Sequence, residues 1–452
     1  MPNSAELVKK YNSPAPRYTS YPTVPLWENN LEPQDWNDLV KKAFINFGEK
    51  EGISIYIHLP YCESLCTYCG CNKRITKNKQ VQDPYIEALL AEWEKYKAIF
   101  KSRPKISGIH LGGGTPTFFD PSSLDHLIST ILKGSAISPN AEFSFEGHPN
   151  NTSFEHLKTL SDLGFNRVSY GIQDFDEKVQ KAIHRIQPFE KVKYATDSAR
   201  ILGYTSINFD LIYGLPHQTI NSLSDTFNKV NELKPDRIAF YSYAHLPSAF
   251  PAQQSFEHFL PTETEKSELY TFGRALLVKM GYVEIGMDHF ALENDPLTLA
   301  KNEGSLHRNF MGYTTLPSKI LIGMGASSIS DVYYAYAQND KTIERYKAET
   351  MKGEWSIQKG HRLSKIDLQI RSIILELICR KEAEIPVEVW EQFSETQVWN
   401  LKEMELDGLI SINSTLIKVS QRGMNFIRNI CSQIDLRLSK NQAKKTLFSQ
   451  TV

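Results

Sequence analysis

Four of the six cysteines in this 452-residue chain lie in one ten-residue segment, CESLCTYCGC at residues 62–71. Cys62, Cys66 and Cys69 follow a C-x3-C-x2-C spacing, which lets one loop direct three thiolates toward one cluster. Three thiolates hold three irons of a [4Fe–4S] cube, whose usual protein complement is four. The spacing therefore predicts a [4Fe–4S] cluster with one iron that is not ligated by cysteine and is open to an outside ligand.

A zinc site is the alternative for the same loop. Zinc usually takes two ligand pairs separated by a dozen or more residues, and four cysteines within ten residues make a poor tetrahedral clamp. The spacing thus favours an iron–sulfur cluster over zinc. The other two cysteines, Cys379 and Cys431, lie in apolar helical stretches, and we expect both in the core.

Other chemically unusual residues stand where predicted strands end. From residue 53 to about 245, short β-branched or aromatic runs alternate with turns and helices. This alternation predicts right-handed βαβ units and a parallel sheet. The predicted strands span residues 53–59, 107–114, 142–147, 167–173, 207–214 and 237–245. At or just after their ends come the cysteine loop, the GGGTP turn, Glu146, Gln173, Asp210 and His245.

This placement of polar residues distinguishes two architectures. In an open doubly wound sheet only the switch point gathers a site, whereas in a barrel all the C-terminal loops converge on one mouth. Six strands are too few for a closed eight-stranded barrel. The sequence therefore predicts an α/β fold with a partial (β/α)6 barrel that is open on one side and admits a large, flat substrate.

The chain divides into three predicted segments. Residues 1–50 carry too many prolines for a helix and are expected to form an extension over the barrel mouth. Residues 51–335 should form the barrel. Residues 336–452 should form a mainly helical, winged-helix-like lid domain, in which residues 407–430 contain a two-stranded wing followed by a helix. No wide basic face accompanies this domain, so DNA binding is not expected.

The overall composition excludes several classes of protein. Lys plus Arg (51) nearly balance Asp plus Glu (52), so no global field favours nucleic acid or an anionic membrane. No apolar run approaches the length of a membrane span, and the N-terminus lacks the apolar core of a signal peptide. Cysteines gathered on one loop suit a reducing compartment. We therefore expect a cytoplasmic protein.

Beyond these patterns, the chain resembles a known family. The cysteine spacing, with Tyr68 before the third cysteine, is similar to that of the radical S-adenosylmethionine (SAM) superfamily. Motifs from about residue 10 to the C-terminus further resemble the oxygen-independent coproporphyrinogen III oxidases (dehydrogenases) of that superfamily. These motifs are PRYTSYPT, YIHLPYCESLCTYCGCNK, GGGTPT, NRVSYGIQDF, NFDLIYGLP, YAHLP, GMDHFA, LHRNFMGYTT, LIGMGASSIS and YAQN.

The resemblance implies which residues bind the cofactors. The open iron would take the amino and carboxylate groups of SAM, and a second SAM molecule would lie beside the first. Glycine permits close backbone approach, carboxylates accept hydrogen bonds from ribose or ammonium groups, and arginine can grip a carboxylate. The residues implied to bind the cofactor are Tyr56, Gly113, Gly114, Thr115, Glu146, Gln173, Arg185, Asp210, Ala244 and Ile329. From the residues alone, a structural salt bridge is the less favoured alternative for Asp210 in its apolar strand.

The same resemblance implies a reaction and partners. Two propionate side chains of coproporphyrinogen III would be oxidatively decarboxylated to vinyl groups, giving protoporphyrinogen IX. A low-potential one-electron donor of the flavodoxin or ferredoxin type and an electron acceptor would take part. We expect a monomer that binds neither nucleic acid nor membrane.

Three alternative functions are weighed against this one. The first is a haem chaperone of the same superfamily. Such relatives lack the long N-terminal extension and tend to replace the fourth cysteine by an aromatic residue, whereas this chain has both the extension and Cys71. The second alternative is a methyl-transferring or ring-opening radical enzyme that acts on haem. The third is a barrel enzyme stabilised by zinc.

Several residues near the predicted site have less defined tasks. Cys71 is implied not to ligate the cluster, and we expect it to shape or protonate the cofactor pocket. His58 is either catalytic or a histidine satisfied within the barrel. Arg17 and Arg308 are candidates to meet substrate carboxylates.

The segment EGHPN marks one departure from the family. After Glu146 the family usually carries an acidic or amide residue before proline, whereas this chain has Gly147 and His148. His245 and His307 have no assigned task and are expected to be structural.

Overall fold

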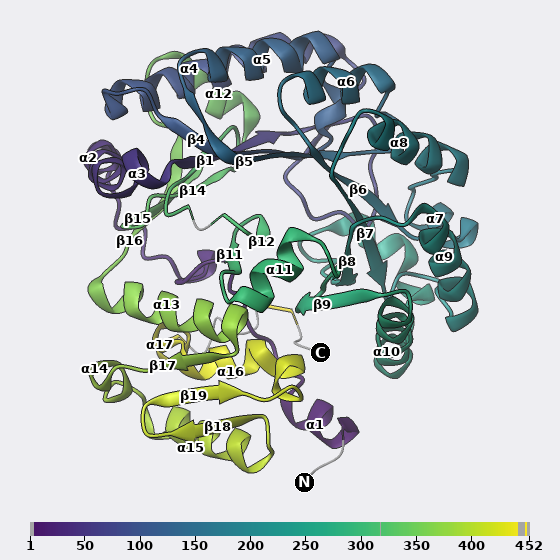
Figure 1. Ribbon diagram of the computed structural model, residues 1–452, viewed down its shortest axis with the longest axis vertical. Helices are drawn as coiled ribbons and strands as arrows, with labels where there is room; N and C mark the ends of the chain where they lie inside the picture. The colour runs from purple at the N-terminus through teal and green to yellow at the C-terminus, as the bar shows by residue number, and fades with distance from the viewer. Residues whose placement is uncertain (1–3, 317, 442–447, 450–452) are drawn as a thin grey trace.

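The computed structural model describes residues 4–316, 318–441 and 448–449. A curved twelve-stranded sheet with helices along its outer face forms the larger part of the molecule (Figure 1). Its strand order is β16-β15-β14-β13-β1-β4-β5-β6-β7-β8-β10-β9. The edge strands β16 and β9 do not pair with each other in the described chain, so the barrel is open, as predicted.

All six predicted strands are confirmed. They are β1 (Ile53–Leu59), β4 (Lys105–Gly113), β5 (Ala136–Gly147), β6 (Arg167–Gln173), β7 (Ser206–Tyr213) and β8 (Arg237–Ser242), and each is parallel to the next. The connecting helices are α4 (Gln82–Phe100), α5 (Pro121–Lys133), α6 (Phe154–Asp162), α7 (Glu177–Ala182), α8 (Phe189–Ile201) and α9 (Ile220–Leu233). Ser153 caps α6 by accepting a hydrogen bond from the backbone N–H of His156.

Further strands extend the sheet at both ends. β13 (Leu321–Met324) pairs in parallel with β1, and β14 (Ile329–Asp331), β15 (Ala335–Asn339) and β16 (Ile357–Arg362) follow in antiparallel order around α12 (Ile343–Met351). At the other end, β10 (His289–Leu292) and β9 (Tyr282–Gly286) are antiparallel and follow α10 (Glu263–Lys279). The predicted boundary at residue 335 therefore falls inside the sheet.

The N-terminal segment corrects one expectation. The prolines were taken to exclude a helix, but residues 4–51 contain α1 (Ser4–Tyr11), α2 (Pro33–Ala43) and the short α3 (Glu49–Glu51). Pro33 occupies the first turn of α2, where a missing N–H costs nothing. Pro14, Pro16, Pro22 and Pro25 lie in the stretch between α1 and α2, which is not α-helical.

The C-terminal part combines helices with a small sheet. It contains α13 (Lys365–Arg380), α14 (Val387–Trp390), α15 (Glu395–Leu406), α16 (Ile427–Ile434) and α17 (Leu436–Lys440). The predicted wing is the hairpin of β18 (Ile410–Asn413) and β19 (Leu416–Val419), which β17 (Glu382–Glu384) extends to three strands. Cys379 and Cys431 are buried in its core, as predicted, and Leu7 of α1 packs into the same core. Within the described chain, none of the helices has the length and apolar character needed to cross a membrane.

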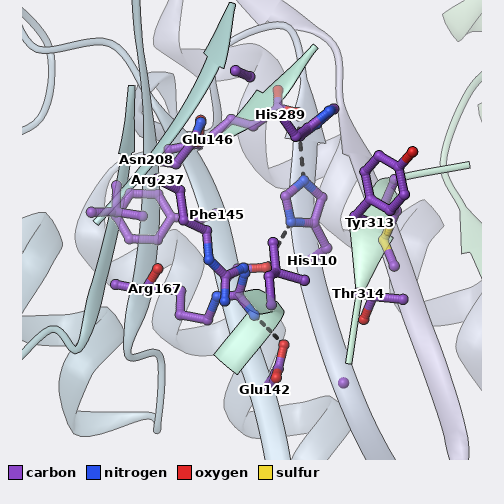
Figure 2. Close-up of a pocket in the computed structure, with 18 of the residues that line it drawn as sticks. His110, Glu142, Phe145, Glu146, Arg167, Asn208, Arg237, His289, Tyr313 and Thr314 are labelled. Carbon is purple, nitrogen blue, oxygen red and sulfur yellow. Dashed lines mark hydrogen bonds and ion pairs between the residues drawn. The ribbon is translucent and has the colours of Figure 1, made fainter. Parts of the chain in front are cut away.

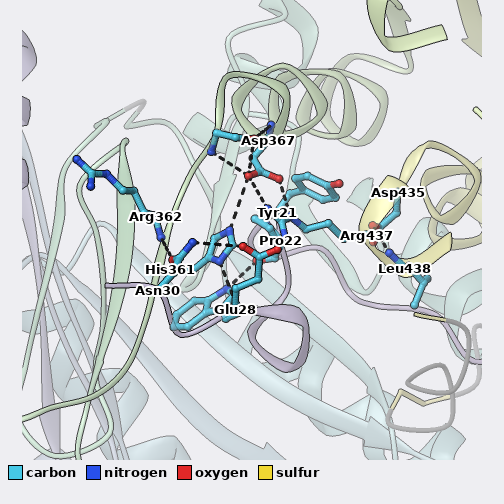
Figure 3. A network of polar contacts seen from close by, with 12 residues as sticks. Tyr21, Pro22, Glu28, Asn30, His361, Arg362, Asp367, Asp435, Arg437 and Leu438 are labelled. Atoms are coloured by element: carbon cyan, nitrogen blue, oxygen red, sulfur yellow. Dashed lines mark hydrogen bonds and ion pairs between the residues drawn. The ribbon is translucent and has the colours of Figure 1, made fainter. Parts of the chain in front are cut away.

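A network of polar contacts joins the two ends of the chain to the barrel (Figure 3). We call Glu28, His361, Asp367 and Arg437 the terminal clasp. Arg437 donates to Asp367 from Nε at 2.7 Å and from Nη2 at 2.9 Å, and it also pairs with Glu28. The backbone N–H of Glu28 donates to His361 Nδ1 at 3.2 Å. The clasp thus connects the N-terminal segment, β16, α13 and α17.

Asp367 is the centre of this clasp. Its side chain is 1% exposed, which alone would raise its pKa. The Arg437 guanidinium and the hydrogen bonds donated by Ser364 outweigh burial and hold the pKa of Asp367 well below its ordinary value. A lowered pKa in the folded state means that the ionised carboxylate stabilises the fold at neutral pH.

We expect Asp367→Asn to lower the free energy of unfolding by about 3 kcal/mol at pH 7, because it leaves Arg437 without its buried partner. The difference between wild type and variant should narrow below about pH 4, where the carboxylate of the unfolded wild type becomes protonated. Urea unfolding as a function of pH measures both effects. Asp162→Asn, which breaks an exposed pair with Lys158, is the control and should cost less than about 1 kcal/mol.

Candidate functional site

The cysteine loop follows β1 at the mouth of the barrel. Cys62 lies in β2 (Tyr61–Cys62), which pairs with β3 (Arg74–Ile75) and returns the loop to the barrel. Cys62, Cys66 and Cys69 line one cavity together with Gly114, Thr115 and Arg185, among others. In the described chain, no three cysteine, histidine or acidic side chains close around a single ion position. The three thiols instead face a shared space from separate points.

Two of these sulfurs accept hydrogen bonds from the barrel. Thr115 Oγ1 donates to Cys62 Sγ at 3.3 Å, and Arg185 Nη1 donates to Cys66 Sγ at 3.3 Å. Lys73 Nζ donates to the carbonyl oxygen of Cys69 at 2.8 Å, which brings a second cation to the loop. Positive charge and donors beside thiols favour the thiolate form that binds metal.

Cys71 lies outside the cavity lining but contacts one of the three cysteines. Burial raises the pKa of Cys62 to about 11. A hydrogen bond from the Cys71 thiol lowers the pKa of Cys69 to about 6, with help from the Lys73 charge. The same contact raises the pKa of Cys71, which therefore stays protonated as the donor. Cys71 is exposed, whereas Cys66 is buried.

The glycine turn after β4 presses against the cysteine loop. A Cβ on Gly114 would lie 2.7 Å from the carbonyl carbon and oxygen of Pro60, and Gly113 has φ of +113° with its missing Cβ 2.6 Å from the His58 ring. The N–H of Gly114 donates to Leu59 O at 2.9 Å. Only glycine allows this approach, so the turn sets the position of the loop.

A second cavity of about 190 Å³ lies inside the barrel. Figure 2 shows polar side chains from neighbouring strands pointing into it, among them His110, Glu146, Asn208 and His289. Alternate residues of a strand face the same side, which is why His110 and Gly112, or Asn208 and Asp210, share this interior. Asp210 also lines the cavity.

Glu146 lines the barrel cavity and bonds the glycine turn that leads to the cysteine cavity. Its Oε2 accepts the N–H of Gly113 at 3.2 Å, and its Oε1 lies 3.5 Å from His110 Nε2. Burial opposes ionisation, but these two groups outweigh it, so the pKa of Glu146 lies below its ordinary value. Glu146 is therefore an ionised acceptor beside the glycine turn.

Asp210 is a carboxylate with neutral partners. It accepts from Asn208 Nδ2 at 2.8 Å and from Ser169 Oγ at 3.2 Å. No lysine or arginine of the described residues forms an ion pair with it, which argues against the structural salt bridge considered from the sequence. Burial and the charge of Glu146 raise the pKa of Asp210 to about 6.

Gln173 and Arg185 meet behind the cysteine loop. Gln173 has φ of +68°, an uncommon conformation for a residue with a side chain, and its Oε1 is buried without a partner. Arg185 donates from Nε and Nη2 to Gly171 O at 3.1 and 2.6 Å. Because Nη1 bonds Cys66, the guanidinium is anchored, and a bidentate grip on a cofactor carboxylate would require these bonds to exchange.

The remaining predicted residues lie around the same mouth. Tyr56 Oη lies 3.2 Å from His58 Nδ1, and His58 Nε2 lies 2.9 Å from Asn72 O, so both nitrogens of His58 have partners. Burial lowers the pKa of His58. Ala244 is exposed just after β8, and Ile329 opens β14, on the far side of β13 from β1.

The departure at residues 147–148 places a histidine at the cysteine cavity. His148 lines it, and burial together with the Arg185 charge lowers the pKa of His148 to about 3. A Cβ on Gly147 would lie 2.9 Å from Thr152 Oγ1, so this glycine also fits a close approach. His245 lies within 3.1 Å of Tyr243 Oη, outside both cavities.

Several residues of the barrel interior were not predicted. His110, Tyr241 and His289 face the second cavity, with Tyr241 Oη 3.4 Å from His289 Nε2. Strand alternation could have indicated His110, because it lies two residues before Gly112 in β4 and therefore faces the same side of the sheet. His289, in the GMDHFA motif, belongs to an antiparallel strand that was not predicted.

The two arginine candidates have different surroundings. Arg17 pairs with Asp288, in the turn between β9 and β10. Arg308 is buried, donates to Arg17 O at 2.6 Å and lies over the Tyr313 ring. Arg308 thus supports the segment that carries Arg17.

Comparisons with known proteins place these features in context. Residues 56–230 match the family model described as "Radical SAM superfamily". The oxygen-independent coproporphyrinogen III oxidase of Synechocystis sp. is 37% identical, over 99% of this chain and 98% of that protein. The one of Helicobacter pylori (strain J99) is also 37% identical, over 98% and 99%. Among solved structures, coproporphyrinogen III oxidase (HemN) from Escherichia coli, titled a radical SAM enzyme, superposes with a TM-score of 0.87 and 35% identity, covering 96% of this chain and 99% of that one.

The glycine contact generates a test of the cysteine loop. We expect Gly114→Ala to displace Pro60 at a cost of about 1–3 kcal/mol, so the iron bound after anaerobic reconstitution should fall several-fold. Gly134→Ala is the control, because its Cβ would meet only the Lys97 side chain at 3.5 Å. Equal iron and sulfide content in both variants would contradict the importance of this contact.

Proposed function

Because the chain belongs to the family of oxygen-independent coproporphyrinogen III oxidases within the radical SAM superfamily, we propose that it decarboxylates two propionate side chains of coproporphyrinogen III. Each propionate becomes a vinyl group with loss of carbon dioxide, and the product is protoporphyrinogen IX. The observation that carries this proposal is the cavity lined by Cys62, Cys66 and Cys69, in a chain that is 37% identical over 99% of its length to such an enzyme.

The residues of the site fit the two cofactors that the family uses. Three thiols face one cavity, and donors from Thr115 and Arg185 point at two of the sulfurs, as an anionic cluster requires. Two acceptors lie near it: Gln173 Oε1 is buried with no hydrogen-bond donor among the described residues, and Glu146, whose side chain is partly exposed, is ionised. Such acceptors suit the ammonium and hydroxyl groups of SAM.

Each set of residues has a distinct task in the proposed reaction. When bound, the cluster supplies an electron, and SAM supplies the radical that removes a hydrogen atom from a propionate. Cys62, Cys66 and Cys69 would hold three irons of the cluster, and the fourth iron would be open to SAM. Glu146 and Asp210 orient the cofactor by accepting hydrogen bonds, and the surrounding barrel keeps water and other C–H bonds away. Arg185 serves as a positioning residue for Cys66.

Finer points of the proposal rest on family resemblance. They include the second SAM molecule beside the first, a flavodoxin- or ferredoxin-type donor and a separate electron acceptor. Catalytic participation of His58, the cofactor contacts of Tyr56, Thr115, Ala244 and Ile329, the monomeric state and the cytoplasmic location also stay predictions. Both ring nitrogens of His58 already have partners, which favours a structural role in which His58 fixes the end of the cysteine loop at Asn72.

An anaerobic assay tests the reaction directly. The protein is reconstituted with iron and sulfide and incubated with SAM, a strong reductant, coproporphyrinogen III and an electron acceptor. We expect the tetrapyrrole to lose two carbon dioxide units while 5′-deoxyadenosine forms. Formation of deoxyadenosine with an intact tetrapyrrole would mean that the enzyme acts on a different substrate. Haem retention without turnover would favour a haem chaperone. If no cluster forms, the cysteine loop would be interpreted as a zinc site.

The contact between Cys71 and Cys69 leads to a separate prediction. We propose that Cys71 tunes the cluster, because hydrogen bonds to cluster sulfurs adjust its reduction potential. Cys71→Ala, which removes the donor, should keep the iron content but lower the rate of deoxyadenosine formation by about tenfold, which corresponds to ~1.4 kcal/mol. The control is Ser64→Ala in the same loop. If Cys71→Ala keeps both the cluster and the wild-type rate, Cys71 has no such task.

A further inference from the structure

The cysteine loop and the segment that returns from it carry a local surplus of positive charge. Residues 62–79 contain four lysines and arginines but one acidic residue, Glu63, whereas the whole chain has a net charge of −1. Lys79 Nζ lies 3.6 Å from Glu63 Oε1, so this acid is already partly neutralised. The surplus therefore surrounds the loop that carries the three cluster cysteines.

Two large apolar side chains are exposed beside the cysteines. In the pairing of β2 with β3, Ile75 stands opposite Cys62, and Ile75 is 40% exposed. Leu65, three residues after Cys62, is 41% exposed. Cys62 and Cys69 are themselves partly exposed. A cluster held by these cysteines would therefore lie close to the surface of the protein.

Exposed cations border these apolar side chains. Lys77 is exposed and forms no ion pair within the described chain. Lys341 is also exposed, and its carbonyl oxygen accepts a hydrogen bond from Asn72 Nδ2 at 3.0 Å, which ties it to the end of the loop. Arg74 Nη2 lies 2.9 Å from Glu344 Oε1, but an exposed pair contributes less than about 1 kcal/mol and can exchange for another acid.

We call the surface formed by Leu65, Arg74, Ile75, Lys77 and Lys341 the loop face. An apolar centre with a charged rim is the usual composition of a protein–protein interface. Small interfaces are typical of short-lived encounters between electron-transfer proteins. None of these five residues lines the barrel cavity, so a partner on the loop face would leave the barrel interior free.

The proposed reaction needs one electron that reaches the cluster from outside the protein. The partner is oxidised by one electron, the cluster is reduced by one electron, and no covalent bond forms or breaks. At the loop face the cysteine loop meets solvent, so a partner bound there approaches the cluster without entering the barrel. Positive charge on this face favours an acidic partner and speeds its arrival.

A nucleic acid is the other class of partner that positive charge could attract. Nucleic-acid sites commonly neutralise about 6–10 phosphates, each with its own cation. The loop face offers Arg74, Lys77 and Lys341 around an apolar centre, which suits the smaller footprint of an electron-carrier protein.

We propose that the loop face is the docking site of a small acidic electron-carrier protein that reduces the cluster. This proposal rests on the proposed function for the presence of the cluster. Carboxylates of the carrier contact Arg74, Lys77 and Lys341. The apolar surface around the carrier's redox group packs against Leu65 and Ile75.

Cluster reduction by a purified flavodoxin, photoreduced before mixing, tests the site in the reconstituted enzyme. The double variant Lys77→Glu with Lys341→Glu should slow this reduction by at least about tenfold at low salt, because charge chiefly changes the rate of association. The difference should shrink as salt is added. Dithionite, a small reductant that needs no docking, should reduce the cluster of variant and wild type at similar rates.

Binding gives a readout that does not depend on turnover. The Kd of fluorescently labelled, oxidised flavodoxin should rise by at least about tenfold in the double variant. The matched control is Lys9→Glu with Lys402→Glu, which makes the same change of charge at two exposed lysines of α1 and α15, far from α12 and the loop face (Figure 1). Lys77→Arg with Lys341→Arg should bind flavodoxin as wild type does, and equal iron content shows that each variant has folded.

The outcomes distinguish this proposal from the proposed function. If the reduction rate and the Kd of the double variant match those of the control, the docking site is wrong, and decarboxylation by wild type with dithionite would still establish the function. If wild type with dithionite releases no carbon dioxide, the function fails, whereas weaker flavodoxin binding by the double variant alone would still support the docking site. Tighter binding of single-stranded RNA than of flavodoxin, lost in the double variant, would overturn the proposal.

Discussion

The close approach of two backbone segments, the glycine turn after β4 and the start of the cysteine loop, is the constraint on which the rest of the site depends. Gly114 N–H bonds Leu59 O at 2.9 Å, and Thr115 N–H bonds Tyr61 O at 3.0 Å, so the two segments continue side by side beyond the sheet. This contact places Thr115 within hydrogen-bond distance of Cys62, while the N–H of Gly113 binds Glu146 beside the loop. A side chain at either glycine would separate the thiols from the carboxylate that faces them.

The parts of the fold that the sequence predicted are those with strong local patterns. The six parallel strands have β-branched or aromatic runs, and turns with clear glycine or proline signals separate them from amphipathic helices. β13 to β16 are short, and they join the sheet only because β13 pairs with β1, far away in the chain. No local pattern in the sequence indicates such a partner. The helices of the N-terminal segment were missed because prolines were counted over the whole segment, although they cluster between α1 and α2.

Residue types at the site were predictable, but their contacts were not. Asp210 and Glu146 were expected to be acceptors because ionisable groups in apolar strands need a reason to be there. The sequence could not show that Arg185 donates its hydrogen bonds to Gly171 and Cys66, or that Cys71 contacts Cys69. Such contacts depend on how the loops that follow different strands meet at the barrel mouth, and this arrangement is determined only in the folded protein.

The terminal clasp has a consequence for the order in which the protein is made. Glu28 leaves the ribosome 409 residues before Arg437, its partner. All strands of the large sheet, which end at Arg362, can form before that happens, since domains tend to fold as they are synthesised. Until Arg437 emerges, Glu28 and Asp367 lack the guanidinium that joins them. The clasp therefore closes over a large sheet whose strands have all been synthesised, so it fastens the barrel after assembly and does not guide it.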